Sequence, residues 1–185
     1  ISSAYAYRGN ANINQTAVLN QVPFTDQEIE MLQYSYQEEM LARDVYEYFA
    51  DMYNDNTFAR IAQSEQQHMN AVLRLLPQSD IPESYGELTS LYEDLIEKGS
   101  QSLADAYNVG VDIEILDIDD VKELAEETDN SSLQRLWSNL GRASYNHLRA
   151  FVRQLERNDY EVESDYSDYL ENAPQLGKRR GGRRW

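Results

Sequence analysis

The sequence predicts an all-α fold, and three observations lead to that prediction. Apolar residues recur at helical spacing in segments of helix length, and short breaks separate these segments. The chain has 185 residues and is 41% hydrophobic, which is enough for one domain with its own core. No apolar run approaches the roughly 18 residues that a membrane-spanning helix needs. We therefore expect no membrane insertion.

Four long helices and one crossover are expected. The helices should span about residues 25–54, 56–76, 100–128 and 131–155. The first begins at a capping box, in which Thr25 is followed three residues later by Glu28. Residues 78–99 form the crossover, with a short helix at about 87–98. A connection of this length allows the third long helix to run parallel to the second.

The two ends of the chain differ in composition from this helical domain, which we place at residues 23–158. Residues 1–22 show a weak alternation of apolar and polar positions, which predicts an extended N-terminal arm. Residues 159–185 form a segment rich in tyrosine and acids that ends in an Arg-rich tail. The tail is basic although the formal net charge is −17. Because so acidic a surface repels a polyanion, nucleic acid is not an expected partner.

The central motif is Glu65-x-x-His68, which lies within the apolar stripe of the second helix. Burying a carboxylate and an imidazole costs several kcal/mol unless both find a partner. A metal ion is a common partner for this spacing in a helix bundle. The motif therefore predicts a metal site in the core.

Other inward-facing polar residues point to the same site. The fourth helix carries His147, the second of two histidines in the chain, and the third carries Glu114 and Asp117. On the first helix, periodicity alone leaves Glu38 and Glu39 as alternatives. Each residue alone is more often a hydrogen-bonded core residue than a ligand. Together they favour a two-metal site, and their oxygen and nitrogen atoms suit iron, manganese or zinc.

These motifs resemble those of the ferritin-like superfamily. The segment from Glu39 to Tyr46 is similar to the first-helix pattern of rubrerythrins, Glu-x-x-Ala-Arg-x-x-Tyr, and has the Glu-to-Tyr spacing of ferritins. This match favours Glu39 over Glu38. Glu65-x-x-His68 resembles the second-helix ligand pair, and Glu114 with Asp117 resembles the acid pair of the third helix.

The fourth helix departs from that pattern, because Ser144 stands three residues before His147 where the family has Glu. With this departure, the chain is similar to an uncharacterised ferritin-like domain family over about residues 24–157. The resemblance implies a ferritin-like four-helix bundle with a long crossover between the second and third helices.

The resemblance also implies a chemistry, namely a carboxylate-bridged pair of metal ions that reacts with O2 or peroxide. Iron is the expected metal, with manganese or a single zinc ion as alternatives. The implied ligands are Glu39, Glu65, His68, Glu114, Asp117 and His147. Tyr46 is implied as a hydrogen-bond or redox partner, and the alternative is a core tyrosine bonded to an acid.

A second hypothesis is that the protein is a structural subunit of an extracellular filament or surface assembly, with structural metal or none. The N-terminal arm and the Arg-rich tail would then join copies into a homo-oligomer or homopolymer. The chain begins at Ile1 rather than Met, which fits removal of a signal peptide and an extracellular or cell-surface location. Formal glycosylation sequons begin at Asn14 and Asn130.

Overall fold

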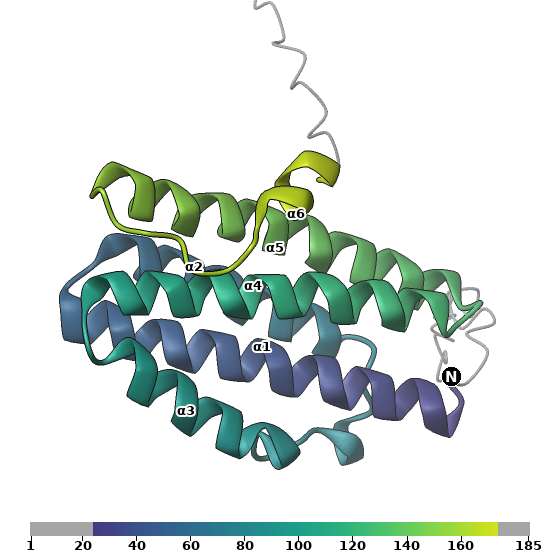
Figure 1. Ribbon diagram of the computed structural model, residues 1–185. Helices are drawn as coiled ribbons and strands as arrows, with labels where there is room; N and C mark the ends of the chain where they lie inside the picture. The colour runs from purple at the N-terminus through teal and green to yellow at the C-terminus, as the bar shows by residue number, and fades with distance from the viewer. Residues whose placement is uncertain (1–23, 174–185) are drawn as a thin grey trace, which may run out of the picture.

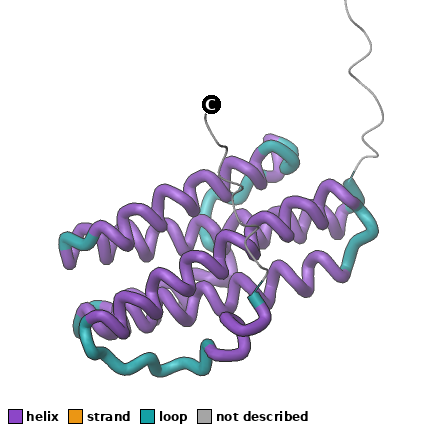
Figure 2. Tube along the Cα trace, turned by 90° about the horizontal axis from the view of Figure 1, so that it is seen from above, coloured by secondary structure: helices purple, strands orange, loops and turns teal. Residues whose placement is uncertain are grey.

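The computed structural model describes residues 24–173, and this part of the chain is all-helical and contains no strand (Figure 2). The all-α prediction is therefore confirmed for these residues. The long helices are α1 (Asp26–Tyr53), α2 (Asn56–Leu73), α4 (Leu103–Glu126) and α5 (Ser131–Arg157). The short ones are α3 (Thr89–Gly99), α6 (Ser167–Asn172) and two 3-10 turns, Gln78–Asp80 and Gly86–Leu88. The expected N-terminal arm, Asn14 and the Arg-rich tail lie outside the described residues.

Local side-chain caps account for where the long helices begin. The hydroxyl of Thr25 accepts a hydrogen bond from the backbone N–H of Glu28, whose carboxylate accepts one from the backbone N–H of Thr25. This is the capping box that the sequence predicts. Asp55 caps α2 and Asn130 caps α5 in the same manner. Asn54 adopts a left-handed conformation, with φ 50°, and so closes the tight turn between α1 and α2.

The four long helices pack in two pairs, α1 with α2 and α4 with α5, and α4 also contacts α1 while α5 contacts α2. Figure 1 shows α2 and α4 starting at the same end of the molecule, so they run in the same direction. The long connection that contains α3 makes this possible, because it returns the chain to the end of the molecule where α2 begins. α3 itself packs across α1 and α4. No helix of the described part is long and apolar enough to cross a membrane.

The core consists of two apolar clusters with a polar layer at their junction. One cluster is aromatic and includes Tyr46, Phe58 and Phe151. The other contains the fully buried Trp137, whose indole N–H donates to the hydroxyl of Ser35 over 2.9 Å. The buried acids and histidines of the chain lie where these two clusters meet. That polar layer positions the site described below.

The chain folds back over α4 after α5 ends, as Figure 1 shows. The side chain of Asn108 donates to the carbonyl of Glu161 and accepts from the backbone N–H of Glu163. Lys98 forms ion pairs of 3.0 Å with both Asp112 and Glu163. The segment ends in α6, which was not expected because six residues are too few to display a helical period.

Close packing of α4 against α5 yields a prediction at Gly110. A Cβ atom at this position would lie 2.8 Å from the ring of Phe151, which is fully buried. Gly110→Ala should therefore lower the free energy of unfolding by about 1–2 kcal/mol, because overpacking outweighs the gain in helix propensity. Urea denaturation measures the change, with Ser138→Ala on the exposed face of α5 as the control. A stabilised Gly110→Ala variant would contradict this packing.

Candidate metal centre

Five buried or nearly buried side chains from the four long helices converge in the polar layer. α1 supplies one carboxylate, α2 a carboxylate and an imidazole, α4 a carboxylate and α5 an imidazole. These residues are Glu39, Glu65, His68, Glu114 and His147. Their inward positions follow from the helical period, which places Glu65 and His68 one turn apart on the same face of α2. The predicted residues are thus brought together by four different helices.

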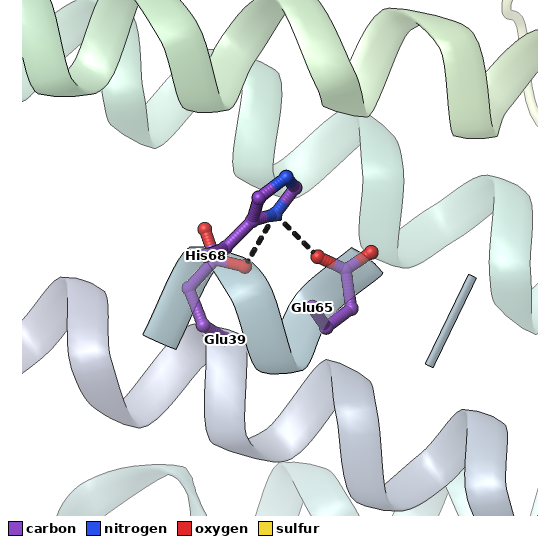
Figure 3. A group of neighbouring side chains, drawn as sticks. All are labelled: Glu39, Glu65 and His68. Atoms are coloured by element: carbon purple, nitrogen blue, oxygen red, sulfur yellow. Dashed lines mark hydrogen bonds and ion pairs between the residues drawn. The ribbon is translucent and has the colours of Figure 1, made fainter. Parts of the chain in front are cut away.

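Glu65 lies at the centre and is only 1% exposed. Its Oε2 atom is 2.6 Å from Nδ1 of His68, and its Oε1 atom is 2.8 Å from Nδ1 of His147. Glu39 Oε2 lies 3.0 Å from Nδ1 of His68, as Figure 3 shows. Glu114 Oε2 lies 3.5 Å from Nδ1 of His147. The five side chains therefore form two triads that share Glu65.

The geometry of both triads fits a metal ion. In each triad the three ligand atoms lie within 4.8 Å of one another. Atoms on opposite sides of an ion with bonds of about 2.1 Å lie about 4.2 Å apart. Within residues 24–173, Glu65 Oε1, Glu114 Oε2 and His147 Nδ1 are buried without hydrogen-bond partners. The first and last are nevertheless only 2.8 Å apart, so they approach a common point without the alignment of a hydrogen bond.

Burial and mutual charge shift the pKa values of these groups in opposite directions. Burial raises the pKa of Glu39 to about 8, although His68 opposes the shift. Burial alone would lower the pKa of His68, but the carboxylates of Glu39 and Glu65 raise it to about 10. The two histidines hold the pKa of Glu65 below its ordinary value despite burial, which acts to raise it. Protons bound to the imidazoles therefore compete with a metal ion for the same atoms.

Ser64 lies behind both imidazole rings and is not among the residues that the sequence motifs predict. Its Oγ atom is 3.1 Å from Nε2 of His147 and 3.5 Å from Nε2 of His68. When Nε2–H of a histidine donates to Ser64, the lone pair of that imidazole is on Nδ1 and points toward the carboxylates. This is the tautomer in which Nδ1 can bind a metal ion. Its position was a usable signal, because Ser64 precedes Glu65 and lies one turn before His68.

Three other expected or alternative residues surround the triads. Tyr46 is fully buried, and its hydroxyl donates to Glu114 Oε1 over 2.7 Å. Asp117 lies beside the triads, where burial and the nearby charges of Glu114 and Glu39 raise its pKa well above the ordinary value. Glu38 is also buried, so both candidates on α1 face inward, but only Glu39 belongs to a triad.

Ser144 stands where the resemblance implies a carboxylate. The side chain is buried, and its hydroxyl donates to the carbonyl of Leu140, one turn earlier on α5, over 3.2 Å. This bond satisfies the hydroxyl within its own helix. Ser144 therefore adds no carboxylate to the shared centre, and α5 contributes His147 alone to the triads.

The fold and the site define an all-helical protein whose core holds two groups of residues able to bind a metal ion. The chain belongs to the family described as an uncharacterized protein domain, DUF2202, whose family model matches residues 28–172. All residues of both triads lie within that match.

The chain is also similar to a protein whose structure has been solved. Over 174 residues the chain is 36% identical to "Uncharacterized protein MJ0754" of Methanocaldococcus jannaschii, a match that covers 85% of this chain and 94% of that protein. The structure is also similar to the crystal structure of hypothetical protein MJ0754 from Methanococcus jannaschii, with a TM-score of 0.74. That similarity covers 83% of this chain and 97% of the other, so the fold is shared over nearly the whole relative.

Ser64→Ala should weaken metal binding without unfolding the protein. Loss of the hydroxyl removes the group that orients both imidazoles, and substitutions behind metal ligands typically cost about 10- to 100-fold in affinity. Competition with a chromophoric chelator measures the change. Ser64→Thr, which retains a hydroxyl, should bind metal more tightly than Ser64→Ala. Equal affinities for the alanine variant and the unsubstituted protein would contradict a positioning role for Ser64.

Metal binding should also strengthen as the pH rises from 6 to 8. The raised pKa of His68, about 10, means that its imidazole carries a proton across this range, and the ion must displace it. Raising the pH reduces that competition, by about tenfold per pH unit for each proton released. Calorimetric titration in buffers of different ionisation enthalpy counts the released protons. An affinity that does not change between pH 6 and 8 would show that these groups do not hold the ion.

Proposed function

We propose that the protein is a ferritin-like four-helix bundle whose core holds a carboxylate-bridged pair of metal ions that reacts with O2 or peroxide. The observation that carries the proposal is the position of Glu65, because each of its two oxygens lies within 2.8 Å of a different histidine. A carboxylate shared in this way is suited to bridging two ions. Ligands projecting inward from four helices are how bundle proteins build such centres.

In this proposal Glu39 and His68 would hold one ion, Glu114 and His147 would hold the other, and Glu65 would be shared between them. Asp117 is the sixth ligand, and its buried position beside the triads supports that role. Four ionised carboxylates carry −4, and two divalent ions carry +4, so the loaded centre is neutral when both imidazoles are neutral. Oxygen and nitrogen donors without thiolates suit iron or manganese.

Iron held in this way supplies the electron transfer needed to reduce O2 or peroxide. The protein's own residues prepare the site for that chemistry. Burial, followed by the charge of Glu114, raises the pKa of Tyr46 well above its ordinary value, so the phenol keeps its proton and donates a hydrogen bond to Glu114. The rings of Phe58 and Phe151, centred 6.1 and 5.2 Å from that of Tyr46, exclude water from this side. Tyr46 thus holds Glu114 in place and is positioned as a redox partner.

One observation favours the structural hypothesis instead. Because Ser144 is bonded within its own helix, the cluster has one carboxylate fewer than the ferritin-like pattern implies. A scaffold of extracellular assemblies would need no redox pair, and a single zinc ion or the protonated residues alone would satisfy its core. We propose that residues 1–22 and the Arg-rich tail join copies of the chain outside the cell under either function.

Metal content distinguishes the two functions. Protein purified without added metal should contain close to two iron or manganese ions per chain by mass spectrometry. A double variant, His68→Ala with His147→Ala, should lose both ions, because each triad loses its imidazole. The matched control is Gln67→Ala with Asn146→Ala, since each residue precedes one histidine and is exposed. This control should keep the metal.

Redox activity is the second part of the test. The metal-containing protein should consume O2 or hydrogen peroxide in the presence of a reductant, and the histidine variant should not. If the purified protein is metal-free and the histidine variant is as helical by circular dichroism, the inward acids and histidines are only a polar core. Zinc alone in both sites would likewise rule out the redox function.

A further inference from the structure

A cavity of about 210 Å³ lies between α1, α3 and α4, next to the candidate metal centre. Six aliphatic side chains line it, contributed by α1, by α4 and by the segment from Leu88 to Leu95. Leu95 and Ile113 are buried, whereas Leu116 is 38% exposed and marks the side open to solvent. The cavity therefore has an apolar wall and an accessible mouth, which are common features of small-molecule sites.

Three acidic residues complete the lining, and the described residues contribute no basic side chain to it. Glu38 and Asp117 are buried, and Asp112 is half-buried and paired with Lys98. Glu38 is 6% exposed, and its Oε1 atom has no hydrogen-bond partner within residues 24–173. A buried polar atom without a partner is costly, so this carboxylate calls for a donor inside the cavity.

The cavity and the metal centre share the wall formed by α1 and α4. Glu38, which lines the cavity, directly precedes Glu39 of the first triad. Asp117 also lines the cavity and lies one helical turn after Glu114 of the second triad. A molecule whose polar end reached Glu38 would therefore lie beside the metal centre.

We propose that this cavity binds a small linear primary amine, with its alkyl chain among the leucines and its ammonium group on Glu38. Size supports a chain of about six carbons, because 210 Å³ corresponds to about seven groups of the volume of a water molecule. Charge supports an amine, since the lining is acidic and the net charge of −17 concentrates cations near the surface. The inference rests on the proposed function in one respect: it makes such amines the substrate class of the metal centre.

Calorimetric titration with hexylamine tests the proposal, with hexanol and hexanoate as ligands of equal length. The purified protein should bind hexylamine at least about tenfold more tightly than hexanol, and hexanoate more weakly still. Glu38→Gln should remove most of the preference for the amine, because it keeps the shape of the side chain and removes its charge. Equal binding of the three ligands, or no binding of hexylamine, would overturn the proposal.

Filling the cavity provides an independent check. Leu91→Trp should reduce hexylamine affinity at least about tenfold, whereas Leu75→Trp, a half-buried leucine outside the cavity lining, should not. If the Leu91 variant does not fold, Leu116→Trp at the partly exposed mouth of the cavity replaces it and should reduce hexylamine affinity to the same extent. Hexylamine binding that survives a folded cavity-filling variant would place the ligand elsewhere.

Metal content measured on the same samples separates this proposal from the proposed function. Leu91→Trp should keep its metal, because the residue lies outside both triads. If metal-free protein still binds hexylamine in the expected pattern, the amine site is supported and the proposed metal centre is contradicted. If metal-loaded protein binds no hexylamine, the metal centre is supported and the amine site is contradicted.

Discussion

The structure depends on the need to neutralise Glu65, a carboxylate buried at the centre of a helical core. Isolated in an apolar interior, an ionised carboxylate is unstable by many kcal/mol. Here an imidazole faces each of its oxygens, and Glu39 and Glu114 complete the two triads. Four helices must keep their relative positions for these contacts to exist. The polar layer therefore constrains the packing of the four helices together with the apolar clusters on either side of it.

The polar layer contains more carboxylates than imidazoles, so the imidazoles alone cannot neutralise all of the acids. Glu39 and Asp117 have raised pKa values because burial and neighbouring acids disfavour their charged forms. The oxygen atoms of such carboxyl groups can bind either a proton or a metal ion. Ser64 and Tyr46 bind the outer sides of the cluster and direct its ligand atoms inward. Strongly shifted pKa values of this kind are common at functional sites of proteins.

α3 explains why α1 buries two faces. The sequence of α1 contains two competing inward stripes, one with Glu38 and the other with Glu39, and both acids are buried. The long helices cover one face, and α3, which packs across α1 and α4, covers the other. Glu39 consequently reaches the candidate metal centre while Glu38 reaches the cavity. The connection that contains α3 thereby places Glu38 in a different environment from its neighbour Glu39.

The sequence by itself determined the helices, the capping box at Thr25 and the inward faces of Glu65, His68, Glu114 and His147, because helical periodicity and capping are local. It did not reveal the return of the chain over α4, the role of Ser64 or the cavity beside Asp117. Only the tertiary structure decided these, since they depend on how each helix is rotated and shifted against its neighbours. Side-chain packing over the whole core sets those rotations and shifts, and no single segment of the chain encodes them.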